Sequence, residues 1–449
     1  MMTFFKKIGS VAGAGVLTLC AAAPAWAQAA AAPVATVNKG DTAWMMISTV
    51  LVLAMILPGL ALFYGGLVRT KNMLSVMTQI GAVACLAMLI WVIYGYSMAF
   101  GPDYTNGLSN FISTFDKAFL KGITPASQAA TFTAGVEIPE YVFVCFQMTF
   151  AAITVALVLG SVVERIKFSA VMVFAAVWLT IVYFPIAHMV WAASGLFFKA
   201  GALDFAGGTV VHINAGVSAL VAALILGKRL GFPKEPMAPH SLTLTGVGTG
   251  LLWVGWFGFN AGSALEANGS AALAMINTFV ATASAALFWM LAERLNGHKG
   301  SALGFCSGIV AGLVAVTPAA GNSGPFGAIV LGAVASIICF YAVTVLKPKL
   351  GYDDSLDAFG IHGIGGMIGA IGTAIVYAPS LGGPGAADYN MAAKLIVQIE
   401  AVATTIVWAS IGTVIAIFIA KAVTGLRVSQ EVEYEGLDLG EHGERAYNP

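Results

Sequence analysis

The chain contains few charged residues. Asp, Glu, Lys and Arg make up 9% of its 449 residues, against about 25% in an ordinary soluble domain. Lys plus Arg and Asp plus Glu both number 21, so there is no basic excess to meet phosphates, which argues against nucleic acid as a partner. Because 59% of the residues are apolar, the composition excludes a disordered chain and indicates a polytopic membrane protein.

Cysteine and clustered metal ligands are scarce as well. No CxxC pair occurs, so neither a disulfide framework nor a zinc site is expected, and the four cysteines in apolar runs are interpreted as buried free thiols. No cofactor is expected. The absence of a nucleophile–base pair, a metal cluster and a phosphate loop also argues against an enzyme.

The first segment has the form of a secretory signal peptide. Lys6 and Lys7 precede a short apolar run at 8–20, and the letters AWA that end at Ala27 fit the small-x-small cleavage pattern. We predict a signal peptide over 1–27. Cleavage would leave the mature N-terminus outside the cytoplasm. The protein as a whole would lie in a bacterial inner membrane.

Apolar runs of about 20 residues are long enough to cross a membrane. Eleven such runs follow the signal: 43–67, 73–100, 138–161, 168–190, 207–227, 242–263, 271–292, 301–317, 326–346, 357–378 and 390–422. Each predicted inner loop holds at least two Lys or Arg, as the positive-inside rule requires for a cytoplasmic C-terminus. We therefore predict an all-α, eleven-span domain over 28–423 and a cytoplasmic tail over 424–449. The outer loop at 101–135 contains no motif that we recognise.

Two histidines lie inside predicted spans, where ionisable groups are costly and are functional candidates by default. His212 lies in DFAGGTVVHINAG of the fifth run, and His362 lies in DAFGIHGIGG of the tenth. Spans that are five apart cross the membrane in opposite directions. The pattern therefore predicts an inverted repeat, runs one to five against six to ten, with an additional eleventh helix.

The glycines around both histidines would let the helices approach closely and bring the two imidazoles into contact. Neutral imidazoles in contact could share or pass a proton. The alternative is two buried histidines that each bond a carbonyl, and the matched pair favours the first interpretation. Asp204 and Asp357 precede the histidines at the span entrances and are expected to cap the helices. For Asp204, capping together with electrostatic support of an outer cation site is favoured over direct ligation of a substrate. Glu400, in the eleventh run, is interpreted as structural or inter-subunit.

Aromatic residues gather near the predicted outer ends of the spans. Phe146 and Phe150 are spaced i and i+4, Trp191 ends the fourth run, and Ser263 ends the sixth. Rings with one hydroxyl suit a small cation. Spacing alone favours the alternative, an interfacial Trp with core Phe residues, over a cation-binding cage. His188 is interpreted as a structural residue at a span end.

Several long motifs together resemble the ammonium transporter family (Amt/Mep/Rh), and specifically its bacterial Amt type. They include FYGGLVR, FQMTFAAITVALVLGSVVERIKFSAV, YFPIAHMVW, GWFGFNAGSA, CSGIVAGLVAVTPAAG and the tail VSQEVEYEGLDLGEHGERAY. With the two histidine segments, the resemblance covers the chain from about residue 40 to its end. It implies ammonium or methylammonium as substrate, a homotrimer, and a tail that answers to a PII-type regulatory protein.

The resemblance also implies roles for individual residues. Ammonium would bind outside with the help of Phe146, Phe150, Trp191, Ser263 and Asp204, and the pore would contain Phe259, stacked on Phe150, together with Tyr183, Trp256, His212 and His362. Ammonium would be deprotonated outside, and ammonia would pass the histidines, with a proton relay making uptake electrogenic. The alternative function is an ammonium sensor that acts through a cytoplasmic partner. The tail is too short to form a signalling domain of its own.

Overall fold

The computed structural model describes residues 36–447, so the predicted signal peptide lies outside the described residues. Within them, eleven helical segments are long and apolar enough to cross a membrane. Each matches one predicted run to within a few residues, except that the fourth extends further, to Lys199. The prediction of an all-α, eleven-span membrane protein is confirmed.

Four of the five spans of the first half contain short π-helical or 3-10 segments. The five spans are Lys39–Leu67 (α1 Lys39–Ala54, η1 Met55–Leu60, α2 Ala61–Leu67), Thr70–Phe100 (η2 Thr70–Asn72, α3 Met73–Ile90, η3 Trp91–Gly95, α4 Tyr96–Phe100), Glu140–Leu159 (α5), Phe168–Lys199 (α6 Phe168–Trp178, η6 Leu179–Tyr183, α7 Phe184–Trp191, α8 Leu196–Lys199) and Gly208–Leu226 (η7 Gly208–Ile213, α9 Asn214–Leu226).

In the second half three of the five spans contain such segments, and the eleventh helix, α16, contains none. These spans are Leu242–Gly262 (α10), Gly269–Leu295 (α11), Ala302–Ala319 (α12 Ala302–Val316, η8 Thr317–Ala319), Pro325–Leu350 (α13 Pro325–Tyr341, η9 Ala342–Leu346, α14 Lys347–Leu350), Phe359–Val376 (η10 Phe359–Gly363, α15 Ile364–Val376) and Met391–Thr424 (α16). Short polar side chains start several of these helices, as N-capping requires. Asn38 accepts from the backbone of α1, Ser241 from α10 and Asn268 from α11.

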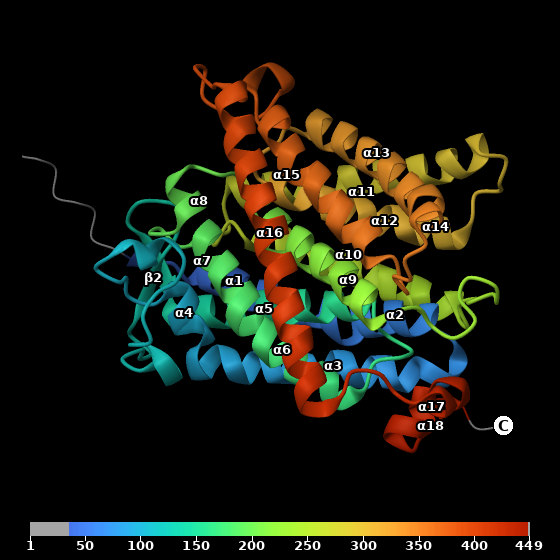
Figure 1. Ribbon diagram of the computed structural model, residues 1–449. Coiled ribbons are helices and arrows are strands. Elements are labelled where there is room, and N and C mark those ends of the chain that lie inside the picture. Colours follow the sequence, from blue (N-terminus) through green and yellow to red (C-terminus); the bar gives the residue numbers. More distant parts are fainter. Residues whose placement is uncertain (1–35, 448–449) are drawn as a thin grey trace, which may run out of the picture.

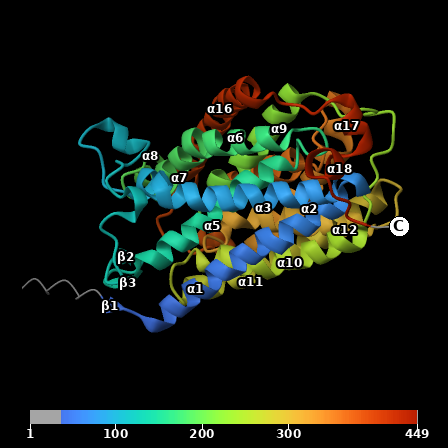
Figure 2. The same cartoon turned by 90° about the horizontal axis from the view of Figure 1, so that it is seen from below.

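The two ends of the helix bundle differ (Figure 2). At one end, strands β1 (Thr36–Val37), β2 (Gln128–Ala130) and β3 (Val136–Pro139) form a small sheet in the order β1-β3-β2, with β1 parallel and β2 antiparallel to β3. We call this end, which also holds the segment 101–139, the loop face. At the other end, the tail folds into α17 (Gln430–Glu435) and α18 (Leu437–His442). We call it the tail face.

The two halves meet through reciprocal glycine contacts. A Cβ added at Gly216 of α9 would come within 2.1 Å of the backbone N of Gly363, and one added at Gly366 of α15 would come within 3.0 Å of the backbone N of Ile213. Each glycine lies four residues after the histidine of its own half and packs on the histidine segment of the other. The long helix α16 crosses both halves obliquely and packs on α6, α9 and α15 (Figure 1).

His188 connects the loop face to the helix bundle through its two ring nitrogens. Its Nδ1 lies 2.8 Å from the carbonyl oxygen of Ala99 in α4, and its Nε2 lies 2.7 Å from that of Ser109. These contacts agree with the expected structural role. The expectation of buried thiols is right for Cys306 and Cys339 but wrong for the other two cysteines of the spans, in α3 and α5, which are exposed because they face outward from the bundle. Glu400 is exposed on α16.

Candidate functional site

The two span histidines lie in contact at the centre of the molecule. His212 in η7 and His362 in η10 bring their Nδ1 atoms to 3.3 Å, and their rings are stacked with centroids 5.3 Å apart. Both residues are buried, with 1% and 4% of their surface exposed. The close approach that the glycine-rich segments predicted is therefore present. It follows from the backbone contacts of Gly216 and Gly366.

Asp204 caps the helix that carries His212, as predicted. Its carboxylate accepts hydrogen bonds from the backbone N–H groups of Gly207 and Gly208 at 2.7 and 2.6 Å, and from that of Thr209 at 2.9 Å. The Thr209 hydroxyl and a weaker 3.3 Å bond from Val210 complete the cap. Gly207 makes this loop possible because its φ of 118° lies in the region that favours glycine.

The prediction that Asp357 caps the helix of His362 is wrong. Asp354 caps this helix instead, because its carboxylate accepts from the backbone N–H groups of Ala358 and Phe359 at 3.1 and 2.7 Å. Burial raises the pKa of Asp354 to about 6, an effect that the nearby Lys347 opposes. Asp357 has a left-handed φ of 60°, and its carboxylate turns away to form an ion pair with Lys347 at 2.6 Å.

The predicted aromatic residues form one cluster above the histidines, toward the loop face. Phe150 lies at their centre: its ring centroid is 4.9 Å from Phe146, 5.6 Å from Trp191 and 4.2 Å from Phe259, on which it stacks. Ser263, at the end of α10, donates its hydroxyl to the carbonyl oxygen of Phe259 at 2.8 Å. The cluster thus combines stacked rings with a hydroxyl whose oxygen keeps lone pairs free.

Trp191 and Asp204 are directly connected. The indole Nε1 of Trp191 donates to the backbone carbonyl of Asp204 at 3.0 Å, so the aromatic cluster and the helix cap form one unit. Tyr183, expected at the vestibule or pore wall, lies in the packed interior of the described chain and has no exposed surface. It does not line either of the two cavities that His362 borders.

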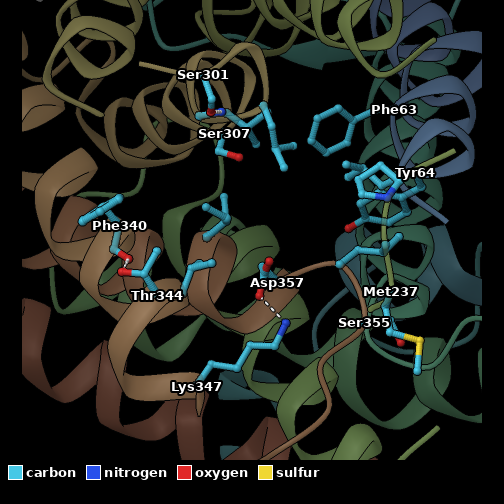
Figure 3. Close-up of a pocket in the computed structure, with 18 of the residues that line it drawn as sticks. Phe63, Tyr64, Met237, Ser301, Ser307, Phe340, Thr344, Lys347, Ser355 and Asp357 are labelled. Carbon is cyan, nitrogen blue, oxygen red and sulfur yellow. Dashed lines mark hydrogen bonds and ion pairs between the residues drawn. The ribbon is translucent and has the colours of Figure 1, made fainter. Parts of the chain in front are cut away.

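Those two cavities differ in size. A narrow one of ≈ 10 Å³ runs past both histidines and is otherwise lined by Phe63, Trp256, Phe259 and non-aromatic apolar side chains. This volume has room for about one water molecule. A wider cavity of ≈ 410 Å³ opens below His362 toward the tail face. Figure 3 shows Asp357 and Lys347 at its edge, with Phe63 and Tyr64 on the opposite wall.

A polar hub beside the histidines was missed by the sequence analysis. The hydroxyl of Thr317, at the start of η8, lies 3.3 Å from His212 Nε2, and the indole Nε1 of Trp256 donates to it at 3.0 Å. The residue stands inside the motif CSGIVAGLVAVTPAAG, but a hydroxyl in an apolar run gives no sign by itself of which helix it faces.

The ion-pair network of the tail face was also missed. Arg229 lies 2.5 Å from Glu164 and 2.7 Å from Asp353, and Arg69 lies 3.0 Å from Glu164. Burial alone would raise the pKa values of Glu164 and Asp353, but the guanidinium groups outweigh it and lower both. The network holds together four loops that are distant in sequence.

The tail docks next to this network. Glu433 of α17 pairs with Arg427 at 2.7 Å and accepts from the backbone N–H of Leu230 at 2.7 Å, next to Arg229. Asp438 of α18 accepts from the backbone N–H of Ser75 at 2.7 Å, at the start of α3. The tail therefore contacts both the loop after α9 and the helix α3.

Comparisons with known proteins agree with this architecture. The model of the Ammonium Transporter Family matches residues 43–447. An ammonium transporter of Aquifex aeolicus is 47% identical over 414 residues, which cover 92% of this chain and 95% of that protein. Among solved structures, Mep2 of Saccharomyces cerevisiae matches with 34% identity, a TM-score of 0.77 and 88% of both chains covered. A structure titled Sensor Amt Protein matches with 28% identity, a TM-score of 0.81, and 90% and 98% covered. The chain belongs to the ammonium transporter family.

Proposed function

We propose that this membrane protein takes up ammonium by capturing the cation at the loop face, removing a proton there, and conducting ammonia past His212 and His362. The observation that carries the proposal is the contact of the two imidazoles, Nδ1 to Nδ1 at 3.3 Å, inside a narrow and otherwise apolar cavity. In a chain of the ammonium transporter family, a polar pair at this place has no packing function that leucines would not serve better.

The aromatic cluster is the proposed capture site. Phe146 and Trp191 would attract a small cation through their ring faces, and Ser263 would accept one of its N–H groups. Asp204 would support binding indirectly, since its charge already accepts backbone hydrogen bonds. Phe150 and Phe259 stack at 4.2 Å and would have to separate for each passage.

Ammonium must lose its proton before the narrow cavity. A bare cation in an apolar passage costs several kcal/mol or more, and ammonia avoids that cost. Potassium cannot shed a proton, so this step provides selectivity. The released proton would follow through the histidine pair and water, which would make uptake electrogenic.

The charge distribution supports one orientation in the membrane. Basic residues concentrate in the loops of the tail face, among them Arg69, Arg229 and Lys347, which favours a cytoplasmic location of that face in a bacterial inner membrane. The loop face and the mature N-terminus after the signal peptide would be periplasmic. The family resemblance supports a homotrimer, and a docked tail with an exposed Tyr434 offers a PII-type protein a surface at the cytoplasmic mouth.

The test uses the full chain reconstituted in liposomes. Uptake of labelled methylammonium and the accompanying charge movement are measured for the wild type, for His212→Leu combined with His362→Leu, and for Thr373→Val as a control. Thr373 is buried in α15, and its hydroxyl donates to the carbonyl of Gly369 away from the pair. The double variant should lose charge movement while the control retains it.

Two results would overturn parts of this proposal. Unchanged charge movement in the double variant would exclude a relay through the histidines. Saturable ammonium binding without any uptake by the wild type would exclude transport and support a sensor instead.

A further inference from the structure

The hydroxyl of Thr317 is surrounded by more acceptors than its single proton can serve. Its Oγ1 lies 2.8 Å from the carbonyl oxygen of Leu313, one helical turn earlier, and 3.3 Å from Oδ1 of Asn260. The orientation of the Asn260 amide is determined by Thr278, whose own hydroxyl donates to Ala274 at 2.7 Å and so must accept from Asn260 Nδ2 at 2.9 Å. Two oxygens that only accept therefore face the Thr317 hydroxyl, and they take its proton.

The oxygen of Thr317 is consequently left as an acceptor toward its remaining neighbours. A hydroxyl has two lone pairs. The indole N–H of Trp256 occupies one of them at 3.0 Å, since an indole can only donate. The other faces Nε2 of His212 at 3.3 Å, so this nitrogen has to bring the proton.

This requirement propagates through the pair. A neutral imidazole with its proton on Nε2 has a lone pair on Nδ1, so His212 Nδ1 accepts and His362 Nδ1 donates across the 3.3 Å contact. The Nε2 of His362 is then unprotonated. Among residues 36–447 no protein donor or acceptor is recorded for that atom, and His362 borders the wide cavity of the tail face.

We propose that Thr317 is a positioning residue that sets the order of protons in the histidine pair: the proton is on Nε2 in His212 and on Nδ1 in His362, and the free basic nitrogen of the pair, His362 Nε2, faces the tail face. The pair is thereby polarised. His362 Nε2 is the position at which it gains a proton without first losing one, whereas His212 is closed toward Thr317. Inward transfer of a proton would require the pair to invert this order first, so the assignment describes the resting state of the pair and rests on the proposed conduction only for its functional consequence.

The direct test is the ¹⁵N NMR spectrum of histidine-labelled full chain in liposomes, because protonated and bare imidazole nitrogens have well-separated shifts. Single substitutions, His212→Gln and His362→Gln, assign the signals. In the wild type we expect a protonated Nε2 on His212 and a protonated Nδ1 on His362. Thr317→Val removes the hydroxyl at nearly constant volume and should convert this single pattern into a mixture of both proton orders.

Two control variants separate the hydroxyl from general packing. Thr317→Ser keeps the hydroxyl and should retain the wild-type proton order, and Thr373→Val removes a buried hydroxyl elsewhere and should do the same. Loss of one hydrogen bond of about 0.5–1.5 kcal/mol should lower the charge moved per methylammonium about two- to tenfold in Thr317→Val only.

The proposal is overturned if wild-type His212 has its proton on Nδ1, or if Thr317→Val leaves the histidine spectrum unchanged. Since the spectrum requires no transport, its result is independent of the uptake assay. A chain that showed the expected proton order without taking up methylammonium would refute the proposed function and leave this assignment standing.

Discussion

Asp204 and Asp354 occupy equivalent positions in the two halves of the repeat, each eight residues before the histidine of its half, but their surroundings differ. Asp204 is held by three short backbone N–H bonds and the Thr209 hydroxyl, and within residues 36–447 it forms no ion pair. Asp354 accepts two backbone bonds and lies next to Asp353, which is paired with Arg229.

The difference shows how one motif serves two ends of a passage. On the loop face, Trp191 donates to the backbone carbonyl of Asp204 and packs on the ring of Phe150, and no basic side chain among the described residues pairs with the Asp204 carboxylate. On the tail face the residues that follow the cap, Ser355 to Asp357, border a cavity of ≈ 410 Å³. The neighbouring acid Asp353 is paired with Arg229, and the backbone N–H of the next residue, Leu230, donates to Glu433 of the docked tail. The Asp204 cap therefore depends on backbone hydrogen bonds, whereas the surroundings of the Asp354 cap depend on ion pairs.

Arg229→Met should break the tail-face end and leave the other intact. It leaves Glu164 and Asp353 buried without this partner, and removing one member of a buried ion pair costs about 3–5 kcal/mol. We expect a large drop in thermal stability in detergent and faster proteolysis of α17 and α18. Arg229→Lys, which keeps the charge, should lose less. Equal protection of the tail in Arg229→Met would refute the dependence of docking on this network.

Acidification provides a second test of the ion pairs at the tail-face end. The pKa values of Glu164 and Asp353 are lowered in the folded protein, so their contribution is present at neutral pH and is lost as the pH falls below about 4.5. Asp354 acts in the opposite direction between its ordinary pKa of 3.8 and its raised value of about 6. Because Asp354 is common to both proteins, the wild type should lose more stability than Arg229→Met between pH 5.5 and 3.5. A parallel decline would contradict the assignment.

Asp204→Ala should destabilise the loop-face end, as Arg229→Met destabilises the tail-face end. It leaves the backbone N–H groups of Gly207, Gly208 and Thr209 buried without their acceptor, at a cost of about 3 kcal/mol. Asp204→Asn keeps one acceptor oxygen and should recover part of the loss. Thermal unfolding measures both. Methylammonium uptake should fall in Asp204→Ala, because Trp191 bonds the carbonyl of residue 204 and moves with the loop.

The reciprocal glycines allow a matched comparison of the halves. A Cβ at position 216 would lie 2.1 Å from the backbone N of Gly363, which cannot move without the helix, whereas a Cβ at 366 would lie 3.0 Å from its nearest atoms in His212 and Ile213. Gly216→Ala should therefore cost about 1–3 kcal/mol and Gly366→Ala less than that. The same ranking should appear in the histidine NMR spectrum. Equal effects would show that the two contacts are equivalent in solution.

The sequence predicted what depends on period, length and matched motifs. It gave all eleven spans, the meeting of His212 and His362, and the gathering of Phe146, Phe150 and Trp191. It did not reveal contacts between spans that carry no periodic signal. The hydroxyl of Thr317 and the pairing of Arg229 with Glu164 depend on rotations and loop paths that no local pattern encodes.

The assignment of the second cap shows the same limit in one detail. Asp357 stands nearest to the span entrance and is therefore the cap that the sequence predicts. The actual cap is determined by backbone geometry, and Asp354 has the same spacing of eight residues to its histidine as Asp204. This spacing can be read from the sequence, but it identifies the cap only when the backbone path before each helix is known.

The smallest expected effect distinguishes these two aspartates. The carboxylate of Asp357 is paired with Lys347, and the two side chains keep 31% and 15% of their surface exposed, so Asp357→Asn should cost less than about 1 kcal/mol. Asn also tolerates the left-handed φ of 60° at this position. Asp354→Asn, by contrast, changes a fully buried cap and should lower the thermal stability clearly more. Reversal of this order would restore Asp357 as the functional counterpart of Asp204 and would remove the basis for treating the two halves as equivalent at their helix starts.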